Sequence, residues 1–170
     1  GDPLPDMMFG MTNTFKYKNF DLGLTISGSI GGDLVIRSME YSHNLDGSFN
    51  MSRELLDCWR SEENPGNGRI PRAAGNAGVT YLARDRSSLM VYDGSYLAFK
   101  NLTIGYTFPK MGWLEQIRVY ASFQNLGYIT SYPGPNPESS ANGTSARYGG
   151  IDDNSYPIPR TYSLGVNIKF

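Results

Sequence analysis

Five segments of the chain alternate between hydrophobic and polar residues, the pattern of β-strands that bury one face. In the last of them, small or polar residues separate Tyr162, Leu164, Val166, Ile168 and Phe170. The five segments are residues of about 8–17, 20–29, 95–108, 117–125 and 161–170. The pattern therefore predicts an all-β fold built from antiparallel strands.

The polar positions of these segments carry small side chains, hydroxyls and amides, such as Thr103, Ser122 and Ser163, rather than many Lys and Glu. Such residues suit the wet interior of a transmembrane barrel. An antiparallel sheet with one solvated face produces the same alternation. Alternation alone leaves both folds open.

The connections between the segments alternate in length along the chain. Two are short, at Lys18-Asn19 and at residues 109–116, and two are long, at residues of about 30–93 and 126–160. Outer-membrane barrels have short periplasmic turns and long extracellular loops. The lengths therefore favour a barrel whose last segment runs toward the periplasm.

The first long loop contains a segment with helical spacing of apolar residues. Asn50 is placed to cap a short helix, and Asn64-Pro65-Gly66 would stop the chain soon after Arg60. The apolar face of this helix would consist of Met51, Leu55, Cys58 and Trp59. We expect that face to pack on the barrel rim, a neighbouring loop or a partner protein.

The composition agrees with strands and turns. Charged residues make up 18% of the chain and aromatic residues 13%, with 20 Gly and 10 Pro. The net charge is −1 and the basic residues are scattered, which argues against nucleic-acid binding.

The chain has one cysteine, Cys58, so it cannot form an internal disulfide. No apolar run is long enough for a spanning helix, and residues 1–5 do not resemble a signal peptide.

No catalytic or metal-binding pattern accompanies the polar residues. Asp152-Asp153-Asn154 lacks the spaced ligands of a calcium loop, and adjacent carboxylates such as Glu62-Glu63 make a poor glycosidase pair. His43 is the only histidine, with no nucleophile elbow or phosphate loop beside it. We expect no enzyme activity, no cofactor and no metal.

Aromatic residues in the two long loops are the candidates for ligand or partner contact, because an aromatic face stacks on a sugar ring while polar neighbours bond its hydroxyls. The candidates are Trp59, Tyr81, Tyr132 and Tyr148, with Asp152 as an acidic neighbour. Trp59 lies on the apolar face of the predicted helix, a position that more often belongs to the core than to a ligand site. For Tyr132 and Tyr148, ligand contact, partner contact and loop packing all stay open.

Short motifs along the whole chain resemble one family of membrane proteins. The motifs are Gly1-Asp2-Pro3, Phe9-Gly10, Tyr17-Lys18-Asn19-Phe20-Asp21-Leu22, Trp59, Glu63-Asn64-Pro65, Pro71-Arg72, Tyr96-Leu97, Lys100-Asn101-Leu102-Thr103-Ile104-Gly105-Tyr106, Arg118-Val119-Tyr120, Gln124-Asn125-Leu126, Gly150-Ile151-Asp152, Tyr156-Pro157 and Pro159 through Phe170. In this order and at this spacing they resemble the C-terminal portion of SusC/RagA-type TonB-linked outer-membrane proteins. Two departures are Gly127, where the family commonly has an aromatic residue, and Asn136-Pro137-Glu138, where it has Asp-Pro-Glu.

The resemblance implies a multi-pass β-barrel in the cell outer membrane, in contact with its lipid. It implies import of an oligosaccharide or peptide delivered by a SusD-like surface lipoprotein, with energy from the TonB complex through an N-terminal part absent here. Five strands are too few to close a barrel, so residues 1–170 would form the C-terminal segment of one. The alternating strand that ends at Phe170 would be the signal for outer-membrane insertion.

Two other classes of protein stay open. A free-standing β-sandwich that binds carbohydrate would carry the same alternation without a membrane. A purely structural outer-membrane barrel segment, such as part of a porin or an adhesin anchor, would share the barrel without the import.

Overall fold

The computed structural model describes residues 1–44, 50–73, 87–139 and 149–170. These residues fall into two compact units. The sheet unit comprises Pro5–Gly32, Gly94–Pro137 and Tyr156–Phe170. The loop unit comprises Gly1–Leu4 and the described parts of Asp33–Asp93 and Glu138–Ser155.

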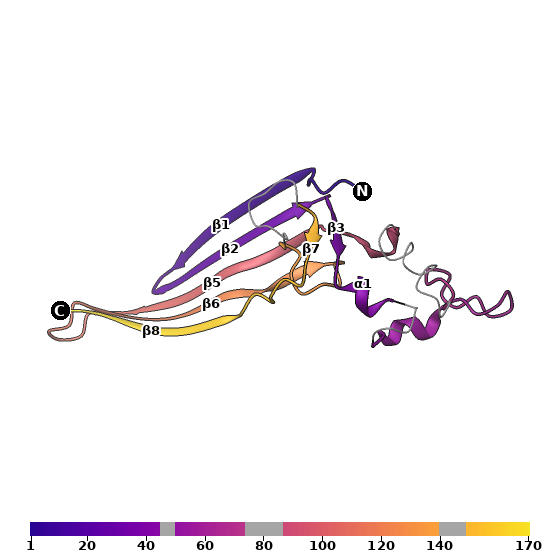
Figure 1. Cartoon of the computed structure of the whole chain (residues 1–170). Coiled ribbons are helices and arrows are strands. Elements are labelled where there is room, and N and C mark those ends of the chain that lie inside the picture. The colour runs from indigo at the N-terminus through magenta and orange to yellow at the C-terminus, as the bar shows by residue number, and fades with distance from the viewer. Residues whose placement is uncertain (45–49, 74–86, 140–148) are drawn as a thin grey trace. The chain divides into compact units, whose positions relative to one another are not determined.

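The sheet unit is one five-stranded antiparallel sheet with the order β1-β2-β5-β6-β8 (Figure 1). Its strands are β1 (Met7–Tyr17), β2 (Phe20–Ile30), β5 (Tyr96–Phe108), β6 (Gln116–Thr130) and β8 (Thr161–Lys169). The strands pair in chain order, since each strand lies beside the next one of the sheet. Antiparallel neighbours of this kind make an up-and-down meander, which confirms the all-β prediction.

The largest difference from the predicted strands is at β6, which continues to Thr130 rather than ending near Asn125. Asn125 has a positive φ of 53°, and the register moves from Asn101–Gln124 to Phe99–Gly127 at this point. Two residues of β6 thus face one residue of β5, which is a β-bulge. The alternation is interrupted at the bulge, so the sequence pattern stopped there while the strand did not.

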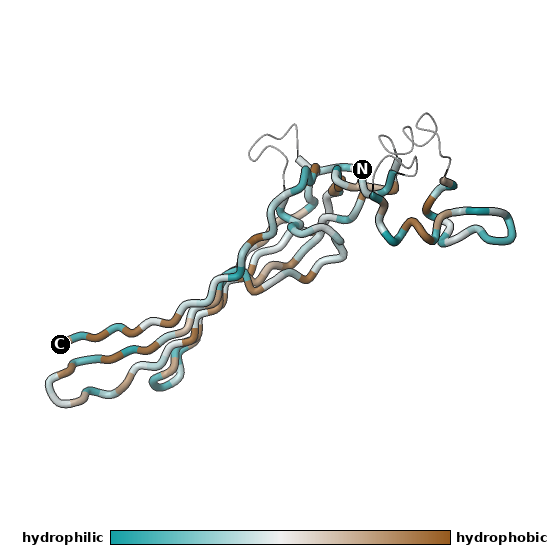
Figure 2. The backbone as a smooth tube through the Cα atoms, turned by 60° about the horizontal axis from the view of Figure 1, so that its bottom comes forward, coloured by the Kyte–Doolittle hydropathy of each residue, from teal (hydrophilic) through white to brown (hydrophobic). Residues whose placement is uncertain are grey.

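The two faces of the sheet differ in chemistry. Cross-strand partners lie on the same face, so the register groups Phe15 with Leu22, Ile104, Ala121 and Leu164. The opposite face carries Gly and hydroxyl residues, and Figure 2 shows the alternation of hydrophobic and hydrophilic positions along the strands. Many residues of the apolar face are exposed, including Leu164 at 87%. Within the sheet unit, no second layer covers that face.

The loop unit contains a second, three-stranded sheet that the sequence analysis treated as loop. Its order is β4-β3-β7, with β3 parallel to β7 and antiparallel to β4. The strands are β3 (Asp33–Ile36), β4 (Val91–Asp93) and β7 (Ile151–Asp152). Two to four residues give no recognisable alternation, which explains why the pattern missed them. Leu34 and Ile36 of β3 are buried.

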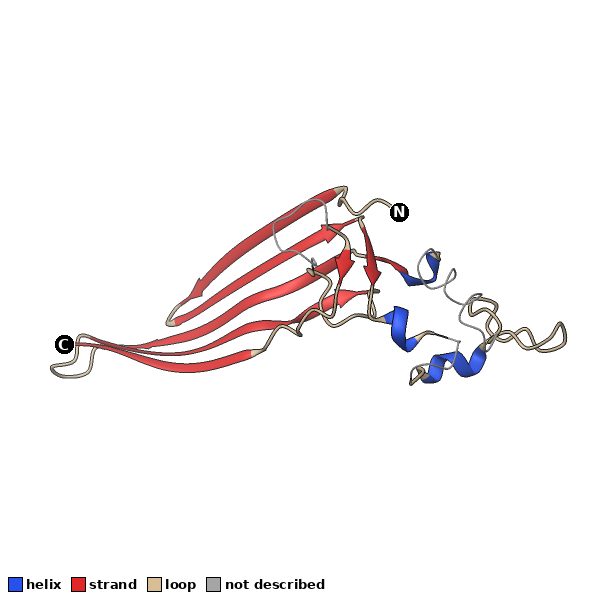
Figure 3. Cartoon of the chain, viewed as in Figure 1, coloured by secondary structure: helices blue, strands red, loops and turns tan. Residues whose placement is uncertain are grey.

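The helices of the described chain all lie in the loop unit (Figure 3). They are α1 (Met39–Ser42) and the 3₁₀ helices η1 (Arg53–Asp57) and η2 (Ser88–Met90). In the parts of the chain that the structure describes, no helix is long and apolar enough to cross a membrane.

The helix predicted from Asn50 to Arg60 is wrong in its extent and its cap. Ser52 caps η1, because its hydroxyl accepts a hydrogen bond from the amide of Glu54. After Asp57 the chain turns away, and the amide of Trp59 donates to the carbonyl oxygen of Ile70 at 3.0 Å. Leu55 and Ile70 form a small buried cluster with Cys58 packed against it. This tertiary pairing ends the helix early.

Candidate functional site

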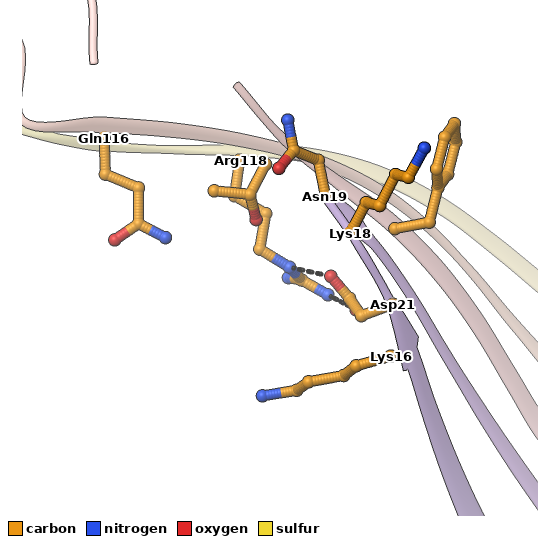
Figure 4. A pocket seen from close by; sticks show the side chains of 8 residues that line it. Lys16, Lys18, Asn19, Asp21, Gln116 and Arg118 are labelled. Atoms are coloured by element: carbon orange, nitrogen blue, oxygen red, sulfur yellow. Dashed lines mark hydrogen bonds and ion pairs between the residues drawn. The ribbon is translucent and has the colours of Figure 1, made fainter. Parts of the chain in front are cut away.

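A hollow of about 490 Å³ lies at the end of the sheet next to the β1–β2 turn (Figure 4). It is lined by Lys16, Lys18, Asn19, Phe20, Asp21, Thr107, Gln116 and Arg118. The lining residues come from β1, the β1–β2 turn, β2, β5 and β6. Charged residues therefore gather here on a polar face that otherwise carries small and hydroxyl side chains.

An ion pair between Arg118 and Asp21 forms the centre of this hollow. The Nε and Nη2 atoms of Arg118 donate to the two carboxylate oxygens of Asp21, at 3.0 and 2.5 Å. This two-point geometry matches the planar guanidinium to the planar carboxylate. Asp21 lies on β2 and Arg118 on β6, so the pair crosses the strand between them, β5.

Gly105 of β5 lies beneath this ion pair. It is the cross-strand partner of Asp21 on one side and of Tyr120 on the other. A Cβ atom at Gly105 would meet Arg118 Nη2 at 2.5 Å and the Asp21 carboxylate oxygens at 2.6 Å. Only glycine leaves room for a side-chain pair that spans three strands.

Tyr120 extends the arrangement toward β8. The guanidinium carbon of Arg118 lies 5.0 Å from the centre of the Tyr120 ring, a cation–π contact. A Cβ atom at Gly165 would lie 2.4 Å from the same ring, so Tyr120 lies flat over the backbone of β8. The two glycines therefore allow a continuous layer of side chains across four strands.

The hollow has an excess of positive charge. Asp21 and Arg118 neutralise each other, and among the described residues neither Lys16 nor Lys18 has an ion-pair partner. The Lys18 ammonium lies 5.4 Å from the centre of the Tyr17 ring at the turn. The alternation of hydrophobic and polar residues did not indicate this cluster. The available signal was charge, because Asp21 and Arg118 interrupt a face of small residues.

A smaller hollow of about 190 Å³ lies within the loop unit. It is lined by His43, Glu54, Asp57, Asn67, Arg69, Ile70, Leu89 and Tyr92. The His43 ring is held between two side chains, with Ser42 Oγ at 3.0 Å from Nδ1 and Glu54 Oε2 at 3.2 Å from Nε2. Carboxylates, an amide and a guanidinium thus surround a space about the size of one sugar or amino-acid unit.

Tyr92 contributes a protonated phenol to that hollow. Burial raises the pKa of the Tyr92 hydroxyl, Arg69 nearby lowers it, and the Glu54 carboxylate raises it. The hydroxyl donates to Met39 Sδ at 3.3 Å. Tyr92 therefore stays neutral and acts as a hydrogen-bond donor throughout the physiological pH range.

The predicted loop contacts lie in different surroundings. Trp59 is half-buried directly after η1. Tyr132 is 4% exposed with its ring over Gly134. Asp152 is 1% exposed, and its carboxylate accepts from the amide and hydroxyl of Ser155 at 2.9 and 2.6 Å. As contact residues these three stay predictions.

Two further predicted contacts, Tyr81 and Tyr148, lie outside the described residues. Of the five aromatic and acidic candidates, the structure therefore describes Trp59, Tyr132 and Asp152. Within the described ranges, no group of three or more His, Cys, Asp or Glu residues is placed to hold a metal ion.

The apolar residues of β8 are exposed rather than buried. Tyr162 makes an edge-to-face contact with Phe123, with ring centres 5.8 Å apart. Phe170 stacks on Trp113 of the β5–β6 turn at 5.9 Å. The amide of Glu115 also donates to the carbonyl oxygen of Lys169 at 2.9 Å. The end of β8 is thus fastened to that turn.

Comparison with known proteins identifies relatives that align with the whole chain. The TonB-dependent receptors P3 and P26 of Formosa agariphila are each 36% identical to it over its full length. TonB-dependent receptor SusC of Bacteroides thetaiotaomicron is 28% identical over 99% of the chain. No family model matches the chain. The chain spans 17% of the length of P3 and P26 and 15% of that of SusC.

Solved structures show the same fold. A structure of the RagAB peptide importer in its open-open state superposes with a TM-score of 0.77, covering 98% of this chain and 17% of that one at 22% identity. A structure of the RagAB peptide transporter gives a TM-score of 0.72 over 99% of the chain. The chain belongs to the family of TonB-dependent receptors of the SusC/RagA type.

Proposed function

We propose that these residues form part of the barrel wall and the extracellular loops of an outer-membrane nutrient importer. The observation that carries the proposal is the sheet of β1, β2, β5, β6 and β8, with one exposed apolar face and one small polar face. The apolar face suits lipid and the polar face suits a wet lumen. A free-standing module in water would leave that apolar face uncovered.

The proposed orientation follows from the connections. The β1–β2 turn and the β5–β6 turn would lie in the periplasm, and the loop unit would belong to the extracellular side. Aromatic residues gather at the turn end of the apolar face, where Tyr106 contacts both Phe20 and Phe108 edge to face. Such a cluster matches the aromatic girdle at a membrane–water interface.

Cysteine labelling in intact cells tests this orientation. The natural Cys58 is first replaced by Ser. A cysteine is then placed at Ser61, an exposed position of the loop unit, or at Lys18 in the β1–β2 turn. A membrane-impermeant maleimide should label the cysteine at position 61 directly, and the one at position 18 only after the outer membrane is permeabilised. Equal labelling of both positions in intact cells would contradict the orientation.

We further propose that the substrate is an oligosaccharide or a peptide, delivered by a SusD-like lipoprotein and imported with energy from the TonB complex. RagAB is described as a peptide importer, which supports a peptide. Loop contacts to ligand or lipoprotein would come from the aromatic candidates Trp59, Tyr81, Tyr132 and Tyr148, with Asp152.

Uptake of labelled oligosaccharides and peptides by cells with and without the intact receptor gene distinguishes the substrate classes. Equal uptake of every compound by both strains would contradict import.

The alternating series of Tyr162, Leu164, Val166, Ile168 and Phe170 is proposed as the signal for outer-membrane insertion. Removing Phe170 from the intact protein also removes its stacking on Trp113. The level of receptor in the outer membrane should then fall. Replacing Trp113 by Ala removes the same stacking and keeps the signal, so it serves as the control. Normal insertion without Phe170 would argue against the signal.

A further inference from the structure

We propose that the charged hollow at the β1–β2 turn binds a carboxylate from an acidic segment of the same receptor that fills the barrel interior. The proposal rests on the proposed function, since the polar face of the sheet must line that interior. Arg118, Lys16 and Gln116 are the residues that would make the contact.

The first reason is the unused hydrogen-bonding capacity of Arg118. A guanidinium has five N–H donors. Two of them bond the Asp21 carboxylate, from Nε and Nη2. No other hydrogen bond of this side chain is present among the described residues. Asp21 therefore holds the guanidinium in place where it lines the hollow (Figure 4), and three of its donors stay available.

The second reason is charge. Lys16 is the cross-strand partner of Asp21 and extends into the same hollow (Figure 4). The one negative charge of Asp21 is paired with Arg118, so Lys16 leaves the group of three with one positive charge in excess. Lys18 adds a second at the rim of the hollow. An anion would neutralise this excess, and a carboxylate matches the flat edge of Arg118.

The third reason is the surrounding amides. The side chains of Asn19 and Gln116 line the hollow and make no hydrogen bonds among the described residues. Amide N–H groups donate to carboxylates as well as to water. Donors thus come from two sides of the hollow, in addition to the cations.

The choice of a polypeptide occupant follows from size and place. The curated relatives are far longer than this chain, which spans 17% of P3. The lumen of the largest outer-membrane transporters is plugged rather than empty. A segment of the same molecule makes the contact intramolecularly, so the contact does not depend on the concentration of a free anion.

Carbodiimide cross-linking of the full-length receptor tests the proposal, because it joins an amine directly to a carboxylate in contact with it. Lys16 or Lys18 should be joined to an Asp or Glu outside residues 1–170, as read by mass spectrometry. Lys110 is the matched control, since it is exposed in the β5–β6 turn and does not line the hollow. Cross-links from Lys16 and Lys18 to Asp21 alone, or to no carboxylate, would overturn the proposal.

Charge reversal provides a second readout. K16E should increase the rate at which protease cuts the segment in the lumen, whereas K110E should leave that rate unchanged. Equal rates in wild type and K16E would count against the contact.

A lipid head group is the other possible occupant of the hollow. The rate at which Lys16 is acetylated is therefore measured for the receptor in nanodiscs with and without phosphatidylglycerol. Protection that requires this lipid would overturn the proposal in favour of lipid.

The two proposals fail in different ways. A receptor that does not reach the outer membrane contradicts the proposed function. A receptor that is inserted and imports its substrate, but in which Lys16 and Lys18 contact no carboxylate beyond Asp21, contradicts only the charged contact.

Discussion

At the scale of single residues, the polar face is organised by side chains that lie across neighbouring strands. Arg118 reaches over β5 to Asp21, and Tyr120 lies over β8. Each side chain needs a glycine on the strand beneath it: Arg118 lies over Gly105, and Tyr120 lies over Gly165. The requirement comes from space, because neither glycine has a positive φ.

Gly105→Ala tests this dependence. The added methyl would occupy the volume of the ion pair, so we expect a loss of about 1.5–3 kcal/mol, the value of hydrogen bonds to charged groups. Gly23→Ala is the control, because a Cβ atom there has nothing within 4 Å. Midpoints of urea unfolding in detergent measure both. In a double-mutant cycle with D21N, additive losses would show that Gly105 does not act through the ion pair.

Asn125 has two roles that can be separated. It adopts a φ of 53° at the bulge, and its amide donates to the carbonyl oxygen of Pro159 at 3.2 Å. Asn125→Gly keeps the backbone geometry and loses the hydrogen bond, whereas Asn125→Ala loses both. We expect the alanine variant to be less stable than the glycine variant by about 1 kcal/mol, since left-handed backbone costs roughly 1–2 kcal/mol for a residue with a Cβ. Equal unfolding midpoints of the two variants would contradict a role for φ.

At the scale of elements, β8 has one face for lipid and one for the lumen. Leu164 lies on the apolar face opposite Ala121, and Ser163 lies on the polar face opposite Ser122. Adjacent residues of one strand would thus face different surroundings, lipid on one side and the aqueous lumen on the other. The same reasoning applies to β2, β5 and β6, whose registers continue both faces across the sheet.

A pair of adjacent arginine substitutions tests this assignment. Leu164→Arg in the intact receptor should cost about 2–4 kcal/mol, the cost of a lipid-facing arginine near the bilayer midplane. Ser163→Arg faces the lumen and should be tolerated. The amount of receptor in the outer membrane and its unfolding midpoint measure the difference. If both substitutions had the same effect, the assignment of the two faces would be wrong.

At the scale of the whole molecule, the sheet unit exposes its apolar face and the outer edges of β1 and β8. Expressed alone, residues 1–170 should therefore need detergent or self-association to stay in solution. Size-exclusion chromatography with light scattering, with and without detergent, measures this. A monodisperse monomer without detergent would contradict the lipid-facing assignment of Leu22, Leu102 and Leu164.

Much of the sheet was predictable from the sequence, because a side-chain period of two directly reports strands with two different faces. The loop unit was less predictable. Its strands are two to four residues long, and η1 stops at Asp57 because Trp59 pairs with Ile70. Neither feature leaves a periodic trace in the sequence.

The sequence by itself determined the five long strands apart from the end of β6, their two faces, the alternating loop lengths and the motifs of the family, because all of these are local patterns. Only the tertiary structure decided the register. The register brings Asp21 and Arg118 together although they are 97 residues apart, places Gly105 beneath them, and leaves Lys16 beside them. The physical reason is that an ion pair across three strands depends on alignment between strands, which local patterns do not encode.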